Sequence, residues 1–267
     1  MKIIVNGKGG VGKTSIVAGL ATLFAKNGFG VLALDVDSFP NLAQSLGIPP
    51  EKAYSIIPLS KNEELVEERT GAKPGQGWGL FFSLTPKVDD LVEKYGIKIG
   101  DNIRLVVIGS IDSGKEGCMC PAIALAKAFL RHVLLEENEL VIVDSEAGLE
   151  VFGRGLAEKF DLMICVSEPT YKSMVASKKM FSLAKDLDIK NRLLVINKVT
   201  DIDSALKIYD NVFGEENVPY HIVRFDSHLS KIEEMGLGIY SLPSHSIFLE
   251  DLRKLYSRIC KILKIKR

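Results

Sequence analysis

A glycine-rich segment near the amino terminus has the residue types and spacing of a phosphate-binding loop. Residues 7–14, GKGGVGKT, match the pattern G-x-x-x-x-G-K-[ST], in which backbone N–H groups and a helix amino terminus surround phosphates. The pattern predicts that Lys13 contacts the β- and γ-phosphates, that Thr14 binds Mg²⁺ and that Ser15 bonds a more proximal phosphate. The predicted nucleotide contacts of this loop are Gly7, Lys8, Gly9, Gly10, Val11, Gly12, Lys13, Thr14 and Ser15.

Carboxylates close two apolar runs of the sequence. Asp35 and Asp37 end the run VLALDVD, and Asp144 ends the run LVIVD. Carboxylates at strand ends beside a phosphate loop can order Mg²⁺ and an attacking water. A single strand-terminal Asp is more often a helix cap or a turn residue. Two such strand ends together with a phosphate loop favour a functional role for Asp37 and Asp144, and we expect a structural role for Asp35.

A pair of cysteines, Cys118 and Cys120, forms a Cys-x-Cys motif flanked by glycines and by Pro121. Pro121 suits the first helical position, which puts Cys120 at the cap, where the helix dipole favours thiolates. One chain offers only two thiolates here, but a two-fold dimer would bring four together. Four thiolates could hold Zn²⁺ tetrahedrally or Ni²⁺ in a tetragonal field. Two adjacent free thiols or a local redox pair is the alternative interpretation, and Cys165 and Cys260 are interpreted as buried hydrophobes.

The elements that must position these residues alternate along the chain. Nearly continuous apolar runs predict buried parallel strands, at Lys2–Asn6, Val31–Val36, Ile103–Ile108, Leu140–Asp144, Leu162–Ser167, Leu193–Asn197 and Tyr220–Arg224. Helical periodicity predicts helices, at Lys13–Lys26, Pro121–Glu137, Tyr171–Leu187, Asp203–Phe213 and Phe248–Leu263. The expected fold is α/β, with a doubly wound, mostly parallel sheet that binds ligands at the carboxyl ends of its strands.

The alternation of strands and helices weakens between residues 47 and 101. We interpret this stretch as an insertion at one edge of the sheet within a single domain that spans residues 1–267. The segment at about 110–121 is interpreted as a metal-binding loop that carries the Cys-x-Cys motif.

Composition limits the classes of function. The chain has 267 residues, 46% hydrophobic and 25% charged, with 34 Lys and Arg against 34 Asp and Glu, as in soluble globular proteins. A net charge of zero argues against a general affinity for nucleic acid. The amino terminus lacks the apolar region of a secretion signal, and no stretch is long and apolar enough to span a membrane. We therefore expect a protein of the reducing cytoplasm.

The segment KGGVGKT resembles the deviant Walker A motif of the MinD, ParA, nitrogenase iron protein and Mrp ATPases. The resemblance implies that Lys8 reaches across a homodimer to the partner's nucleotide as the γ-phosphate departs. It also implies that Asp37 positions the hydrolytic water, that Asp144 is the Walker B acid and that Asn197 reads adenine, so that the nucleotide is ATP. The implied catalytic residues are Lys8, Lys13 and Asp37, and the implied magnesium residues are Thr14, Asp37 and Asp144.

A narrower resemblance is to the CooC-type ATPases, which mature carbon monoxide dehydrogenase. It is carried by three parts of the sequence: the run GKEGCMCP at residues 114–121, the run DSEAG at 144–148, and the run FGRG at 152–155. The stretches ERTG at 68–71 and LTPKV at 84–88 are similar to that family's insertion. The resemblance implies an ATP-dependent homodimer that binds Ni²⁺ through Cys118 and Cys120 and serves a client nickel enzyme.

Two other functions of the same superfamily remain as alternatives. The basic, amphipathic tail at residues 252–267 would suit a MinD-like membrane-positioning ATPase. A final helix packed on the sheet would show the same apolar stripe. We favour this second interpretation and therefore do not expect a membrane partner. A dimer could also bridge an iron–sulfur cluster with four cysteines, as in a carrier of the Mrp or nitrogenase iron protein kind.

Overall fold

The computed structural model describes residues 1–37, 39, 41–74, 82–109, 120–135, 140–145, 153 and 157–265. Within these residues, eight strands form one sheet in the order β3-β4-β2-β5-β1-β6-β7-β8. The strands are β1 (Lys2–Gly7), β2 (Val31–Asp35), β3 (Ile97–Ile99), β4 (Ile103–Val107), β5 (Leu140–Asp144), β6 (Leu162–Ser167), β7 (Arg192–Val199) and β8 (Tyr220–Arg224). All neighbours pair in parallel except β3, which lies antiparallel to β4 at the edge. The predicted doubly wound α/β fold is confirmed.

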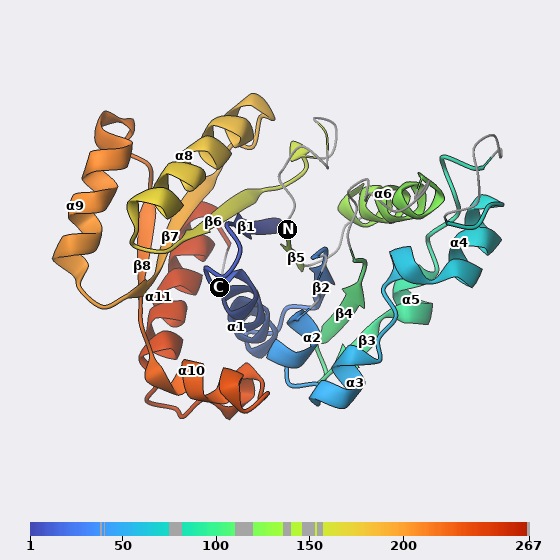
Figure 1. Cartoon of the computed structure of the whole chain (residues 1–267), viewed down its shortest axis with the longest axis horizontal. Helices are drawn as coiled ribbons and strands as arrows, with labels where there is room; N and C mark the ends of the chain where they lie inside the picture. Colours follow the sequence, from blue (N-terminus) through green and yellow to red (C-terminus); the bar gives the residue numbers. More distant parts are fainter. Residues whose placement is uncertain are drawn as a thin grey trace.

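Helices cover both faces of the sheet (Figure 1). They are α1 (Lys13–Lys26), α2 (Leu42–Ser45), α3 (Pro50–Tyr54), α4 (Glu63–Thr70), α5 (Leu91–Tyr95), α6 (Cys120–Leu135), α8 (Tyr171–Asp186), α9 (Ile202–Phe213), α10 (Ser227–Glu234) and α11 (Ile247–Ile262). Short 3₁₀ turns occur at η1 (Leu59–Lys61), η3 (Gly214–Glu216) and η4 (Ile239–Ser241). The helices of one face are α4, α5, α6, α8 and α9, whereas α1, α2, α10 and α11 pack on the other.

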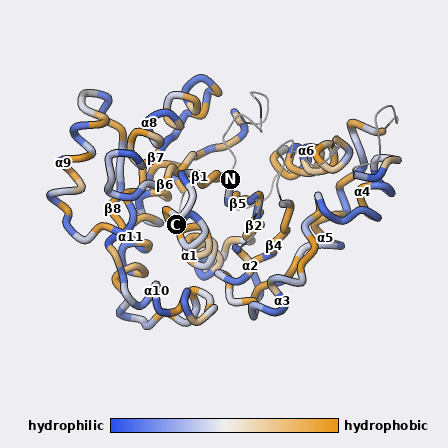
Figure 2. Tube along the Cα trace, viewed as in Figure 1, coloured by the Kyte–Doolittle hydropathy of each residue, from blue (hydrophilic) through white to orange (hydrophobic). Residues whose placement is uncertain are grey.

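The strands are apolar on both sides because each face of the sheet is covered. On β1, Ile3 and Val5 pack into one core and Ile4 into the other, and all three are fully buried. Figure 2 shows the hydrophobic residues concentrated in the sheet and on the helix faces turned toward it. This two-sided burial explains why the sequence shows continuous apolar runs rather than alternation.

The described residues between 47 and 101 lie around the edge of the sheet that β3 and β4 form. They supply the edge strand β3, and their turn η1 and helix α4 pack against α6. A bidentate pair joins α4 to the turn before α5, because Arg69 donates to both carboxylate oxygens of Asp90 at 3.0 and 2.8 Å. The strand β3 was not predicted, because a run of three residues carries too little periodicity.

The carboxyl-terminal helix α11 packs its apolar face on α1 and β8. The buried residues of this face include Leu252, Leu255, Tyr256 and Ile259, whereas Arg253, Lys254 and Lys261 are exposed. The prediction that this amphipathic helix packs on the sheet is therefore confirmed.

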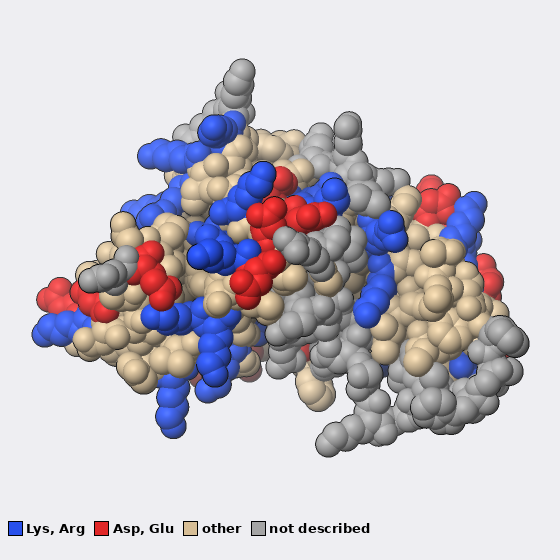
Figure 3. All heavy atoms as spheres, turned by 90° about the horizontal axis from the view of Figure 1, so that it is seen from above, with Lys and Arg blue, Asp and Glu red and all other residues tan. Residues whose placement is uncertain are grey.

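Within the described part of the chain, no helix combines the length and apolarity that crossing a membrane requires. Figure 3 shows Lys and Arg side chains interspersed with Asp and Glu on the face that it displays.

Asp226 fixes two helices that frame the carboxyl edge of the sheet. Its buried carboxylate caps α10 by accepting from the His228 N–H at 2.9 Å. The same carboxylate accepts from the Ser246 hydroxyl at 2.6 Å and from the Phe248 N–H at 3.1 Å, at the start of α11. Burial alone would raise the pKa of Asp226, but the hydrogen bonds from Ser246, Phe248 and His228 lower it to about 2.

Replacing Asp226 by Ala is expected to lower the free energy of unfolding by about 3 kcal/mol, because two caps and the partner of a buried hydroxyl are lost. Since folding lowers the pKa of Asp226, its contribution is complete above about pH 4 and is lost as the pH falls toward 2. Urea denaturation at neutral pH measures the loss. The control is Asp201→Ala, which removes the exposed cap of α9 alone and should cost about 1 kcal/mol. Equal losses for the two variants would contradict the double role of Asp226.

Candidate active site

The phosphate-loop motif lies between β1 and α1, at the carboxyl edge of the sheet. Gly12 is the N-cap of α1 and has a φ of 92°, a left-handed conformation that a glycine adopts without strain. At Gly7, a β-carbon would lie 2.3 Å from the carbonyl oxygen of Val166, so only glycine fits between β1 and β6. The glycines thus let the backbone turn tightly and pack closely against β6 and β7.

The two lysines of the loop have different surroundings. Lys13 is 5% exposed, and its ammonium group donates to the carbonyl oxygen of Lys8 at 3.3 Å. Lys8 itself is exposed. Lys13 therefore lies within the loop, as expected for a phosphate ligand, while the side chain of Lys8 is accessible to a second molecule.

Two buried carboxylates face each other behind the loop. Asp35 and Asp144 are register partners on β2 and β5, and both are at most 1% exposed. Burial raises the pKa of both carboxyl groups, and the neighbouring Asp35 raises that of Asp144 further. The Thr14 hydroxyl and the Lys13 ammonium lie close enough to oppose part of this shift.

The hydrogen bonding of these two acids separates their roles. Asp35 accepts from the N–H groups of Leu42 at 3.0 Å and Asp37 at 3.2 Å, which matches its predicted structural role. Among the described residues, neither carboxylate oxygen of Asp144 has a hydrogen-bond partner. An orphaned, buried carboxylate beside a Thr hydroxyl and phosphate ligands fits a Mg²⁺ ion, directly or through its waters.

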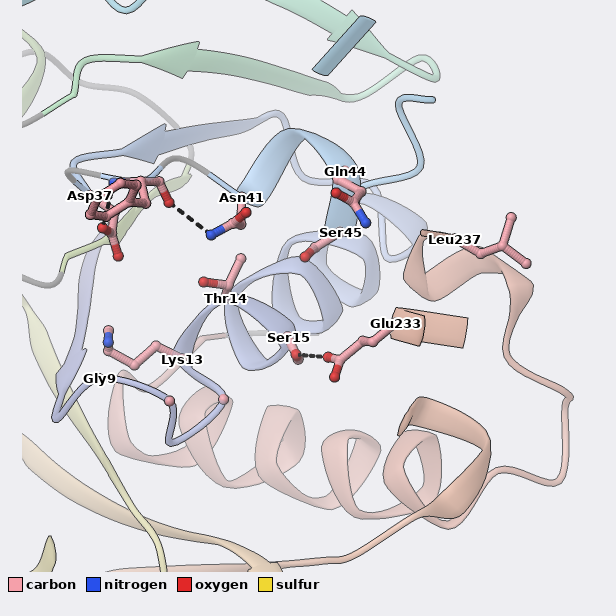
Figure 4. Close-up of a pocket in the computed structure, with 13 residues that line it drawn as sticks. Gly9, Lys13, Thr14, Ser15, Asp37, Asn41, Gln44, Ser45, Glu233 and Leu237 are labelled. Atoms are coloured by element: carbon pink, nitrogen blue, oxygen red, sulfur yellow. Dashed lines mark hydrogen bonds between the residues drawn. The ribbon is translucent and has the colours of Figure 1, made fainter. Parts of the chain in front are cut away.

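The loop opens into a pocket of about 420 Å³ (Figure 4). Its lining residues are Gly9, Gly10, Gly12, Lys13, Thr14, Ser15, Asp37, Phe39, Asn41, Gln44, Ser45, Glu233 and Leu237. Asp37 is half-buried at the rim, and one of its carboxylate oxygens accepts from the Phe39 N–H at 2.9 Å. The structure therefore brings the predicted residues Lys13, Thr14, Ser15 and Asp37 to one cavity.

Ser15 contacts a residue that the sequence analysis did not identify. Its hydroxyl donates to the Glu233 carboxylate at 2.6 Å, from the first turn of α1 to α10. Both residues also line an adjoining pocket of about 100 Å³ that includes Asn197, Phe225 and Leu229. Glu233 lies on a helix that was not predicted, 218 positions along the chain from Ser15, so no local pattern could have revealed this contact.

Asn197, the predicted adenine contact, is 3% exposed at the end of β7. Its amide nitrogen donates to the carbonyl oxygen of Val11 at 2.8 Å, within the phosphate loop. The neighbouring Lys198, to which no role was assigned, donates to the carbonyl oxygen of Gly10 at 2.7 Å. The base-reading role of Asn197 stays a prediction, supported by its place in the smaller pocket.

The structure describes only part of the predicted thiol loop. Cys118 lies outside the described residues, together with the rest of 110–119 and the switch segment 146–150. Cys120 is exposed and lies in α6 next to Pro121, at the point where the described part of this predicted helix starts. Cys165 and Cys260 are buried, as predicted. Within the described ranges, no cluster of three or more His, Cys, Asp or Glu side chains could hold a metal.

Known proteins are similar to this chain in sequence, and others are similar to it in fold. The profile of the CobQ/CobB/MinD/ParA nucleotide binding domain (CbiA) matches residues 2–239. An ATP-binding protein of Methanocaldococcus jannaschii is 46% identical over 264 residues, which is 98% of each chain. The carbon monoxide dehydrogenase accessory protein CooC of Rhodospirillum rubrum is 38% identical over 245 residues, covering 91% of this chain and 90% of its own.

A solved structure has the same fold as this chain. The septum site-determining protein MinD of Pyrococcus horikoshii, complexed with Mg-ADP, superposes with a TM-score of 0.67 at 19% identity. The superposition covers 100% of this chain and 99% of that one. Together with the phosphate loop and the carboxylates behind it, these matches show that the chain is a P-loop ATPase of the CobQ/CobB/MinD/ParA nucleotide-binding family.

Proposed function

We propose that this ATPase is a nickel metallochaperone, which holds Ni²⁺ between two subunits through Cys118 and Cys120 and inserts it into a client metalloenzyme such as carbon monoxide dehydrogenase. The observation that carries the proposal is the hydrogen bonding where β4 ends. The N–H groups of Ile108 and Gly109 donate to the carbonyl oxygen of Asp35 at 2.8 and 3.3 Å. The chain leading from β4 to both cysteines is thus hydrogen-bonded, at its start, to Asp35, which lies two residues before Asp37.

The chemistry of ATP hydrolysis follows from the placement of the chain's own residues. Lys13 and the loop amides would bind the β- and γ-phosphates, and Thr14 and Asp144 would hold Mg²⁺, which neutralises developing phosphate charge when bound. Asp37 would orient the attacking water from the rim of the pocket. Lys8, exposed on the outer side of the loop, would stabilise the departing phosphate across a homodimer interface, as an arginine finger does.

The cargo site also needs a dimer. Cys120 lies in the first described turn of α6, where the positive end of the helix dipole would favour a thiolate ligand. Two thiolates from each chain give the four ligands of a tetragonal Ni²⁺ site, and Zn²⁺ could occupy the same site. Nucleotide and metal would therefore both stabilise the same closed dimer, and hydrolysis would separate the thiol loops and release the cargo. The similarity to CooC supports this assignment.

The Mg²⁺ role of Asp144 predicts an unusual stability effect. Because burial raises its pKa, the ionised carboxylate destabilises the metal-free protein, and this cost grows as the pH rises above the usual carboxyl value of about 4. Asp144→Asn should therefore raise the unfolding temperature of the metal-free protein at about pH 8. The same variant should lose most of the additional stabilisation that Mg²⁺ gives to the ADP complex.

Scanning fluorimetry with ADP, with and without Mg²⁺, measures both effects of this substitution. The control is Asp203→Asn, at an exposed position on α9, which should change neither. A variant at Asp144 that is less stable without metal and keeps its full response to Mg²⁺ would contradict the assignment.

The thiol site predicts a stoichiometry of one Ni²⁺ per two chains. The variants Cys118→Ser and Cys120→Ser should each weaken Ni²⁺ binding by more than about a hundredfold, because a hydroxyl is a poor ligand in a thiolate site. Equilibrium titration of the nickel–thiolate absorption measures the loss, with Cys260→Ala as the control because this thiol is buried on α11. Nickel retained by the double serine variant would exclude the site, and a brown, iron-containing protein purified without oxygen would favour the iron–sulfur carrier instead.

The role of Lys8 predicts that its removal slows ATP hydrolysis without weakening nucleotide binding. Lys8→Ala should lower kcat for ATP hydrolysis by about a thousandfold, as removal of a finger supplied in trans does. The affinity for Mg-ADP should change by less than about threefold, because Lys13 and the loop amides remain. Steady-state phosphate release and ADP titration measure the two quantities, with exposed Lys179→Ala on α8 as the control. Unchanged turnover in Lys8→Ala would remove the basis for catalysis across a dimer.

A further inference from the structure

We propose that Lys198 is a positioning residue of the phosphate loop. A bulge at the end of β7 places its ammonium group against this loop. The ammonium group of Lys198 donates to the carbonyl oxygen of Gly10 at 2.7 Å. It also pairs with the carboxylate of Glu168, just beyond β6, at 2.8 Å. Lys198 thus links the outer part of the loop to the ends of two neighbouring strands.

The backbone of β7 is irregular at this position. The pairing between β7 and β8 shifts register between Ile196 and Val199, and Lys198 has a φ of 59°. Successive side chains of a regular strand point to opposite faces of the sheet. The bulge breaks this alternation, so that Asn197 and Lys198 bond two successive carbonyl groups of the same loop, Val11 and Gly10.

A left-handed conformation is costly for a residue with a long side chain, so the surrounding contacts must offset it. A lysine in this region is strained relative to glycine, because its Cβ crowds the backbone. The two contacts of its ammonium group, with the Gly10 carbonyl and the Glu168 carboxylate, are charge-assisted and therefore stronger than neutral hydrogen bonds. Strain of this kind is found where a backbone position serves a site.

The two bonds orient the amide groups that bind phosphate. In a trans peptide, the carbonyl and the following N–H point in opposite directions. The Gly10 carbonyl is held toward Lys198, which turns the Val11 N–H away from that side chain. The Val11 carbonyl is held toward Asn197, which turns the Gly12 N–H away from it. Lys198 and Asn197 would thus fix the amide direction before nucleotide arrives, which lowers the cost of ordering the loop on binding.

The test compares three substitutions at one position. Lys198→Met removes the ammonium group, Lys198→Arg keeps a donor, and Lys198→Gly removes the side chain while it relieves the backbone strain. We expect the Met and Gly variants to bind Mg-ADP about tenfold more weakly, since each loses a charge-assisted bond to the loop. The Arg variant should bind within about threefold of the parent, and exposed Lys179→Met is the matched control.

A second ligand separates loop positioning from a direct contact with the base. Magnesium pyrophosphate, measured by competition with a fluorescent ADP, occupies the loop without a nucleoside, so its affinity should fall by the same factor as that of Mg-ADP. The Gly variant should unfold at the same temperature as the parent or higher, which shows that a lost affinity is not lost folding. Undiminished Mg-ADP binding in Lys198→Gly, or a loss confined to ADP while pyrophosphate binds normally, would overturn the proposal.

Discussion

The hydrogen bonds around Asp35 hold the carboxyl edge of the sheet together. Its carboxylate accepts from Asp37 and Leu42, which shapes the segment between β2 and α2, and its carbonyl oxygen accepts from Ile108 and Gly109. The neighbouring Val36 N–H donates to the carbonyl oxygen of Asp144 at 2.9 Å. The ends of β2, β4 and β5 are thus connected through one short stretch of backbone. Under the proposed function, this stretch would couple the segments of Asp37, Asp144 and the cysteines.

The nucleotide loop is likewise held by residues from distant parts of the chain. The carbonyl groups of Lys8, Gly10 and Val11 accept from the side chains of Lys13, Lys198 and Asn197. Because side chains satisfy these carbonyl groups, the loop needs none of its own amides for them, which leaves amides available for phosphate. The Glu233 carboxylate of α10 accepts a hydrogen bond from the Ser15 hydroxyl, and a phosphate that binds Ser15 would have to replace this bond. Side chains from β7 and α1 thus hold the phosphate loop, while α10 is hydrogen-bonded to the first turn of α1.

Local signals made the fold and much of the site predictable. The glycines and lysine of the phosphate loop, and the acids that end β2 and β5, are adjacent to the strands that position them, so spacing alone located them. The contacts of Glu233 and Lys198 depend instead on residues 218 and 188 positions away along the chain. The conformation of Lys198 could not be predicted either, because a left-handed lysine runs against local preference and is stabilised only by tertiary contacts. The edge strand β3 was too short to produce a pattern.

The most direct test is whether ATP hydrolysis releases the metal from the thiol site. Protein loaded with one Ni²⁺ per two chains is mixed with Mg-ATP or with a non-hydrolysable analogue, in the presence of a chromogenic nickel chelator, while the nickel–thiolate absorption is followed. The account predicts that the analogue preserves the absorption and the dimer, whereas Mg-ATP transfers the metal to the chelator at the rate of phosphate release. Metal transfer that proceeds at the same rate with either nucleotide, or with none, would contradict it.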